Sequence, residues 1–174
     1  GIPDVEVLPV LGCADPYHYR NKMDYTFSNG QWLTPEEFAR PEPPSPELTL
    51  GLHLPERFDK ILGLSECHLQ SVSGEAILLA TGAYFRALTL DAYSTHTHKG
   101  FLRHLVVREG KRTGETMVNL VTTDDRPEVM REYSAFLLGR FPEITTVVNN
   151  ITDRMSMVAQ GESENVYHGP GTIR

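Results

Sequence analysis

A glycine-bounded loop, Gly110 to Gly114, separates two segments of strand-like composition at residues 101–109 and 115–123. Both segments are rich in apolar and β-branched residues, and a short loop containing glycine is a common connection of a β-hairpin. The two strands of a hairpin run antiparallel, so the fold is expected to contain an antiparallel sheet.

Residues 18–28 form the clearest single strand, because apolar and polar side chains alternate along them. One predicted face carries the apolar side chains, and Arg20 and Lys22 lie together on the other. The apolar face consists of Tyr19, Met23, Tyr25 and Phe27. The dipeptide Asn29-Gly30 at the end of this strand is typical of a hairpin turn.

Helices are expected at three places. Thr34-Pro35-Glu36-Glu37 has the cap, proline and glutamate of a helix start, and the prolines of residues 41–46 end that helix in a stiff, exposed loop. Residues 75–90 have helical spacing of apolar side chains, and Asp125 can cap a third helix that ends before Pro142.

Further strands are expected at residues 48–54, 60–64 and 143–152, whereas residues 167–171 read as a loop. Neighbouring strands joined by hairpins, with helices between some of them, favour the α+β class: a largely antiparallel sheet with packed helices. The regular βα alternation of a doubly wound fold is missing, and no G-x-G-x-x-G or P-loop motif indicates a nucleotide site.

Composition narrows the class of protein. The chain has 174 residues, about the length of one domain, and it has no run of apolar residues long enough for a membrane span. The absence of a signal-like start and the presence of only two cysteines, Cys13 and Cys67, fit a cytoplasmic protein. We expect an extended N-terminal segment over residues 1–16 and one α+β domain over residues 17–174.

The charge distribution is uneven. The net charge is −7, which argues against a nucleic-acid partner, yet residues 96–112 contain five Lys/Arg and one Glu and are locally +4. Within this window, alternation places His104 and Arg108 on one strand face with Leu102 and Val106, and Arg103 on the other face with apolar residues. Local charge acts over a Debye length of about 8–10 Å, so phosphate binding stays possible.

Each candidate site has a plainer alternative. Arg20 and Lys22 have a spacing that suits phosphates of an extended nucleic-acid strand, or they belong to a solvated edge face. The His96-x-His98 pair suits a metal, but no carboxylate or cysteine stands at ligand spacing nearby. Cys67, beside a histidine, is a candidate reactive thiol or a buried structural cysteine.

Several segments together resemble the SAM-dependent RNA uracil-C5 methyltransferases. The resemblance is carried by residues 17–28 (Tyr-His-Tyr-Arg-Asn-Lys-Met-Asp-Tyr-Thr-Phe-Ser), 50–53 (Leu-Gly-Leu-His), 61–69 (Ile-Leu-Gly-Leu-Ser-Glu-Cys-His-Leu), 100–108 (Gly-Phe-Leu-Arg-His-Leu-Val-Val-Arg), 113–121 (Thr-Gly-Glu-Thr-Met-Val-Asn-Leu-Val) and the tail from residue 167. The order and spacing of these segments agree over nearly the whole chain.

The resemblance implies that this chain is the central domain of a longer enzyme. A TRAM domain and a Cys-x5-Cys-x2-Cys stretch would precede it, and the SAM-binding domain with the catalytic cysteine and base would come after it. We therefore expect no catalytic residue and no bound SAM here, and a fragment that is inactive alone. Arg20 and Lys22 match positions that are usually basic in this family, whereas Asp24 departs from relatives that carry arginine there. Together with Arg103, His104 and Arg108 of the basic window, they are the expected RNA-binding residues.

Cys67 bears on the choice of substrate. In the 23S rRNA branch of the family, the segment matching Cys67 supplies the fourth ligand of a [4Fe–4S] cluster, and thiolate ligation is the expected chemistry. The resemblance thus implies 23S rRNA as the RNA partner, with the cluster present only in the full-length protein. The alternatives are a tRNA uridine methyltransferase, a free-standing RNA-binding module and a protein-interaction domain.

Overall fold

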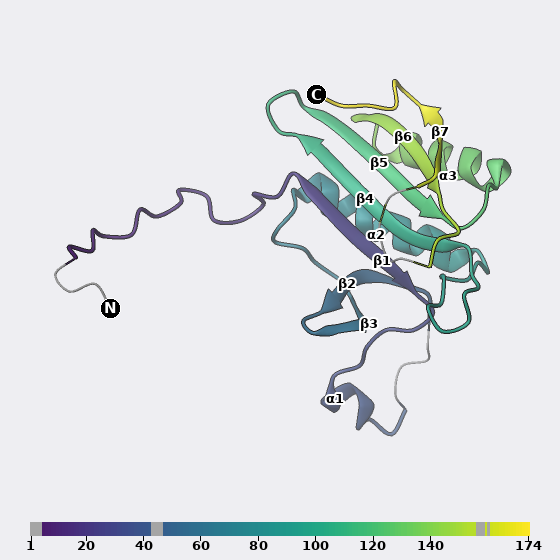
Figure 1. Cartoon of the computed structure of the whole chain (residues 1–174), viewed down its shortest axis with the longest axis horizontal. Helices are drawn as coiled ribbons and strands as arrows, with labels where there is room; N and C mark the ends of the chain where they lie inside the picture. The colour runs from purple at the N-terminus through teal and green to yellow at the C-terminus, as the bar shows by residue number, and fades with distance from the viewer. Residues whose placement is uncertain (1–4, 43–46, 156–158, 160) are drawn as a thin grey trace.

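The computed structural model describes residues 5–42, 47–155, 159 and 161–174, and at its centre lies one seven-stranded sheet (Figure 1). The strand order is β3-β2-β1-β4-β5-β6-β7, and only β5 and β6 pair in parallel. The strands are β1 (Lys22–Ser28), β2 (Thr49–Leu54), β3 (Arg57–Gly63), β4 (Leu102–Gly110), β5 (Glu115–Thr122), β6 (Ile144–Ile151) and β7 (Ser163–His168). The expected α+β class and the β4–β5 hairpin are confirmed.

Two helices cover one face of this sheet. Helix α2 (Val72–Ala87) packs against β2 and β4, and α3 (Pro127–Arg140) packs against β6 and β7 (Figure 1). The short helix α1 (Pro35–Phe38) begins at the predicted capping box, in which Thr34 accepts from the Glu37 amide at 3.1 Å. Helix α2 starts three residues earlier than expected, because Ser71 caps it through the Gly74 amide at 2.9 Å.

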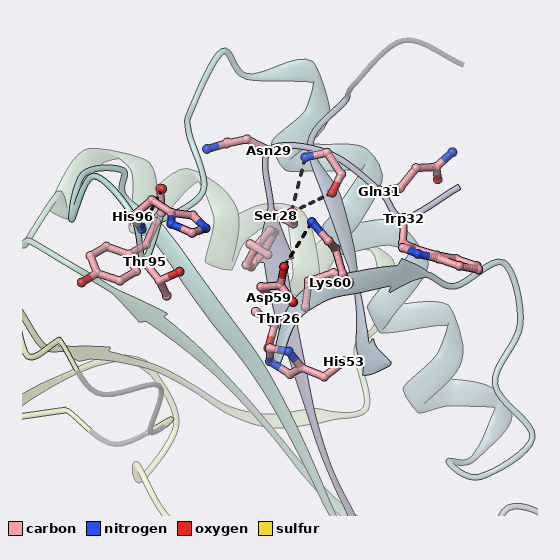
Figure 2. A pocket seen from close by; sticks show the side chains of 15 residues that line it. Thr26, Ser28, Asn29, Gln31, Trp32, His53, Asp59, Lys60, Thr95 and His96 are labelled. Atoms are coloured by element: carbon pink, nitrogen blue, oxygen red, sulfur yellow. Dashed lines mark hydrogen bonds and ion pairs between the residues drawn. The ribbon is translucent and has the colours of Figure 1, made fainter. Parts of the chain in front are cut away.

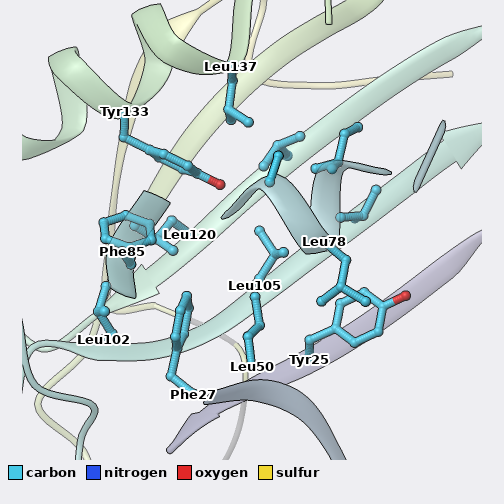
Figure 3. Close-up of a cluster of buried hydrophobic side chains, with 14 of the residues drawn as sticks. Tyr25, Phe27, Leu50, Leu78, Phe85, Leu102, Leu105, Leu120, Tyr133 and Leu137 are labelled. Carbon is cyan, nitrogen blue, oxygen red and sulfur yellow. The ribbon is translucent and has the colours of Figure 1, made fainter. Parts of the chain in front are cut away.

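The hydrophobic core fills the space between the sheet and these helices. Figure 3 shows strand side chains such as Phe27 and Leu105 facing Phe85 of α2 and Tyr133 of α3. Phe27 and Phe85 meet edge to face with ring centroids 5.7 Å apart, a favoured aromatic geometry. All apolar side chains at alternate positions of β1 are buried, so the helices define the inner face of the sheet.

The strand β1 is shorter than the predicted segment of residues 18–28. His18 has a left-handed backbone (φ 53°), and the amides of His18 and Arg20 bond to the carbonyls of His68 and Leu69. This local turn replaces strand pairing, so Tyr19 is 56% exposed, and Arg20 does not share a strand face with Lys22. The prediction was wrong there because side-chain alternation cannot reveal a backbone turn.

Three other expectations were also wrong. Asn29-Gly30 does not close a hairpin; its Asn29 side chain instead bonds both backbone groups of Ala92, at 2.7 and 2.8 Å. Asp125 does not cap α3, whose N-cap position is Arg126 with no side-chain cap bond. Residues 163–168 form the edge strand β7, which sequence reasoning missed because an edge strand exposes most of its polar side chains.

The N-terminal segment lies apart from the sheet. Residues 5–16 run away from the domain in an extended path (Figure 1). The proline loop at residues 43–46 and residues 1–4 lie outside the described residues. Among the residues with described structure, no helix combines the length and apolarity that crossing a membrane requires.

Candidate nucleic-acid interface

The side of the sheet opposite α2 and α3, here called the open face, presents polar residues in register across several strands. One row runs Lys22, Arg108, Met117 and Thr146 from β1 to β6. A second row runs Thr26, His104, Val121, Asn150 and Glu164 from β1 to β7. Because strand partners point to the same side, these residues share one face of the sheet. Lys22, Arg108 and Glu164 are exposed on it, whereas Thr26, His104 and Asn150 are buried.

A groove of about 610 Å³ lies on this open face between β1 and the C-terminal residues. Lys22, Asp24 and Arg108 line one side, and Asn150, Glu164 and Thr172 line the other. The tail is held in place by the Arg174 amide, which donates to Glu115 at 2.8 Å, and by Thr113, whose hydroxyl donates to the Arg174 carbonyl at 3.1 Å. The groove is therefore built from both ends of the described domain.

The two basic side chains of the groove are accessible. Lys22 pairs with Asp24 at 2.6 Å, and both side chains are more than two-fifths exposed, so this ion pair contributes little to stability. The Arg108 side chain is exposed, and within the described residues its guanidinium makes no hydrogen bond or ion pair. An anionic ligand such as a phosphate could therefore contact both groups without a large rearrangement.

Arg103 lies elsewhere than alternation predicted. A register irregularity between Leu102 and His104 inserts it as an extra residue in β4, so it leaves the apolar inner face. It is 2% exposed, its guanidinium lies 4.1 Å from the Tyr93 ring centroid, and its Nη1 donates to the carbonyls of Thr152 and Arg154. Burial lowers the pKa of Arg103. Its contact with RNA stays a prediction, and its visible partners lie inside the domain.

His104 is also buried, at 4% exposure, although it belongs to the open face. Its Nδ1 lies 3.2 Å from the Thr26 hydroxyl, which also contacts Nε2 of His53 at 3.1 Å. Burial is the main cause that lowers the pKa of His104 to about 4, and the nearby Arg103 adds to the effect. The ring is thus neutral at physiological pH, and its predicted role in RNA binding stays a prediction.

The basic window of residues 96–112 does not form one patch. Lys99 lies before β4 and Lys111 lies in the hairpin loop after it, so the nine residues of β4, about 30 Å of strand, separate them. Arg103 is buried between these ends, and only Arg108 joins the groove. Linear proximity therefore overstated how much positive charge gathers at one place.

Within the described residues, neither the histidine pair nor the cysteines belong to a group of metal ligands. His98 contacts the Tyr93 hydroxyl at 3.0 Å, and no three His, Cys, Asp or Glu side chains of the described chain are grouped to hold a metal. Cys67 is 5% exposed beside the Tyr25 hydroxyl (3.7 Å), whereas Cys13 is exposed. Cys67 could supply one thiolate to a cluster, and the described residues provide no complete set of ligands.

Sequence reasoning missed the polar groups on the far side of the groove. Asn150 donates to Asn119 at 3.2 Å and to Glu164 at 2.7 Å, and its side-chain oxygen accepts from the Gly161 amide at 3.0 Å. Alternation within residues 144–151 could have placed Asn150 opposite the core. The pairing with Glu164 could not be foreseen, because it depends on the unpredicted strand β7.

Comparisons with known proteins relate this chain to RNA methyltransferases. Proteins named uncharacterized RNA methyltransferases match it from Chlorobaculum tepidum (33% identity over 99% of this chain), Bacteroides thetaiotaomicron (32% over 94%) and Porphyromonas gingivalis (33% over 94%). The chain spans only 36–37% of the length of these relatives. No protein-family model matches it.

One solved structure supports the fold. The tRNA (uracil-54, C5)-methyltransferase of Pyrococcus abyssi, in complex with S-adenosyl-L-homocysteine, matches with a TM-score of 0.60. The match covers 92% of this chain and 33% of that one, at 22% sequence identity. At this identity the likeness shows a shared fold, with about a third of the larger protein corresponding to this α+β domain.

Proposed function

We propose that this chain is the central, RNA-contacting domain of a SAM-dependent methyltransferase that methylates C5 of a uridine in 23S rRNA. The observation that carries the proposal is 33% identity over 99% of the chain to a protein named an RNA methyltransferase. Because the chain spans about a third of such relatives, the methyl transfer and SAM binding are assigned to other parts of the parent protein, which include a TRAM and a SAM-binding domain.

The role proposed for this domain is to hold the RNA backbone at its open face. Lys22 and Arg108 are partners across β1 and β4, they border the groove, and both are exposed. Charged side chains in this setting contact phosphates, which position a strand without reading its sequence. The net charge of −7 opposes non-specific RNA binding elsewhere on the molecule, so contact at the groove depends on these two local charges.

The choice of 23S rRNA rests on Cys67. Its burial and its position beside Tyr25 suit a ligand enclosed by protein, and a [4Fe–4S] cluster in the parent would take its other three thiolates from outside the described residues. Such a cluster would supply structural or redox chemistry that no residue described here performs. The tRNA alternative has the support of the named substrate of the Pyrococcus abyssi enzyme, whose likeness to this chain concerns the fold.

A methylation assay tests this proposal. The full-length parent protein is incubated with SAM carrying an isotope-labelled methyl group, and with 23S rRNA or tRNA transcripts. Mass spectrometry of digested RNA should then find labelled 5-methyluridine in the 23S rRNA only. Label in tRNA alone would move the substrate to tRNA, and label in neither RNA would reject the activity.

A further inference from the structure

Figure 2 shows a second hollow, here called the β3 pocket. It lies toward the other end of β1 from the groove, because Thr26 and Ser28 line it whereas Lys22 and Asp24 line the groove. Its volume of about 370 Å³ falls within the ~300–1,000 Å³ range of small-ligand sites. Thr26 and Ser28 of β1 lie at its base. Asp59 and Lys60 of β3 lie across from Thr95 and His96 of the loop before β4.

The loop wall of the β3 pocket is fixed to the end of β1, which lies beside the pocket base. Asn29, at the end of β1, bonds both backbone groups of Ala92, and Tyr93 continues from Ala92 into the loop wall. The Tyr93 amide bonds to the Leu102 carbonyl at 2.7 Å, and the Tyr93 ring lies against the Arg103 guanidinium. This side of the pocket is therefore preformed, which reduces the ordering that binding would require.

The charged pair of the β3 pocket presents an acceptor next to a donor. Lys60 Nζ lies 3.2 Å from one Asp59 carboxylate oxygen, and Arg57 Nε lies 3.5 Å from the other. The Lys60 and Asp59 side chains are 43% and 27% exposed. Lys60 also holds the pKa of Asp59 below its usual range, so the carboxylate is charged at neutral pH. An exposed pair of this kind is weak, so a ligand that accepts from Lys60 and donates to Asp59 could replace it at little cost.

The other lining residues suit a flat ligand. Trp32, Tyr93 and His96 contribute rings, and Thr95 contributes a hydroxyl. Rings of this kind stack on unstacked bases, at about 1–3 kcal/mol per base. Among bases, uracil and guanine carry a ring N–H beside a carbonyl oxygen, which matches a carboxylate next to an ammonium. Adenine and cytosine present a ring acceptor at the equivalent place.

The β3 pocket lies on the same strand face as the groove. Lys22 and Asp24 of β1 line the groove, and Thr26 and Ser28 line the pocket. The seven residues from Lys22 to Ser28 span about 20 Å along the strand, so one extended RNA segment of a few nucleotides could reach both hollows.

We propose that the β3 pocket binds one unstacked nucleotide of the RNA strand whose backbone crosses the groove, with preference for a uracil or guanine base. This inference rests on the proposed RNA-contacting function. It adds a base-reading site to a surface otherwise suited to phosphate contacts.

Intrinsic fluorescence tests the β3 pocket directly, because Trp32 is the only tryptophan of the chain and lines it. The full chain is titrated with UMP, GMP, AMP and CMP, and its affinity for short oligo-U and oligo-A RNA is measured in parallel. UMP and GMP should change the emission at lower concentration than AMP and CMP. Asp59→Asn should weaken the affinity for oligo-U about tenfold and should change the affinity for oligo-A little.

Three further variants separate this inference from the proposed function. Lys60→Met should weaken binding of oligo-U, whereas the charge-matched control Lys99→Met, at a residue that lines a different hollow, should not. Lys22→Ala with Arg108→Ala reports on the groove alone. If the groove variant weakens RNA binding while Asp59→Asn and Lys60→Met leave it unchanged, the pocket proposal is wrong and the RNA-contacting role stands. If none of these variants changes RNA binding, the RNA-contacting role fails too.

Discussion

At the scale of single residues, His104, buried beside Thr26 on the open face, makes folding stability depend on pH. His104 is surrounded by the sheet, Arg103 and His53, and these surroundings lower its pKa from 6.5 to about 4. A histidine whose folded pKa is depressed must lose its proton to stay buried. The contribution of His104 to the free energy of unfolding is therefore complete above pH 6.5, and it falls as the pH drops from 6.5 toward 4.

This leads to a prediction for His104→Gln. Because His104 stays neutral in the folded state and takes up a proton in the unfolded state, the free energy of unfolding of the wild type should fall by about 2 kcal/mol between about pH 7.5 and pH 5. The glutamine variant does not titrate, so it should lose less stability over the same range. Urea unfolding at the two pH values measures the difference, with His168→Gln as an exposed control. Equal acid sensitivity of wild type and His104→Gln would contradict the burial argument.

Arg103 marks the limit of what alternation predicts for single residues. The same reasoning placed Met23, Tyr25 and Phe27 correctly in the core, because β1 pairs regularly with β4 and then with β2 along these positions. It misplaced Arg103, because one extra residue in a strand changes which side the neighbouring side chains face and leaves no mark in the local composition. Which charges reach solvent thus depended on a backbone irregularity that only the three-dimensional pairing reveals.

At the scale of elements, β2 depends on a close approach to β3. A Cβ added at Gly51 would lie 1.8 Å from the Leu62 carbonyl oxygen of the neighbouring strand, which no packing could accept. Gly139 of α3 differs, because nothing lies within 4 Å of a Cβ added there. Substitution by alanine is therefore expected to be unfavourable at Gly51 and tolerated at Gly139.

The paired variants Gly51→Ala and Gly139→Ala test this contrast. Gly51→Ala should destabilise the domain by about 2 kcal/mol or more, because β2 and β3 must separate to admit the methyl group. Gly139→Ala should stabilise it by about 0.5–1 kcal/mol, because alanine loses less backbone freedom in a helix. Thermal unfolding of both variants gives the sign of each change, and a neutral Gly51→Ala would refute the close strand approach.

Elements with strong local signals were predictable, and those that depend on partners were not. The β4–β5 hairpin has glycines at its loop, and α1 begins with a capping box formed by four consecutive residues. Both elements could therefore be predicted from the local sequence. The strand β7 has the sequence Ser-Glu-Asn-Val-Tyr-His and is a strand only because β6 offers it an edge. The far side of the groove could not be predicted for the same reason, because Asn150 and Glu164 meet only through the pairing of β6 with β7.

At the scale of the whole molecule, the two faces of one sheet differ in what they contain. The face under α2 and α3 contains the core, and the open face carries both the groove and the β3 pocket. Under the proposed function, the charged residues that contact RNA are Lys22 and Arg108, and the net charge of −7 opposes RNA binding elsewhere on the molecule. An RNA strand should therefore be guided along β1 and held weakly elsewhere.

Cys67 and Cys13 give a prediction for the parent protein. If Cys67 is the fourth cluster ligand, then Cys67→Ala in the full-length protein, prepared without oxygen, should lose the visible iron–sulfur absorbance. Cys13→Ala should keep it, because Cys13 is exposed and lies in the extended N-terminal segment. An unchanged spectrum in the Cys67 variant would remove the support for the 23S rRNA branch.

The most direct test of the central claim, that the open face contacts the RNA backbone, is the salt dependence of binding in the parent protein. Each phosphate contact to single-stranded RNA contributes about 0.7 to the slope of log K against log salt. Lys22→Ala with Arg108→Ala should flatten this slope by about 1.4 and weaken matched and mismatched RNAs alike. The control, Arg131→Ala with Arg140→Ala on α3, removes equal charge from the opposite side of the sheet and should leave the slope unchanged. A groove variant with wild-type affinity and slope would contradict the account.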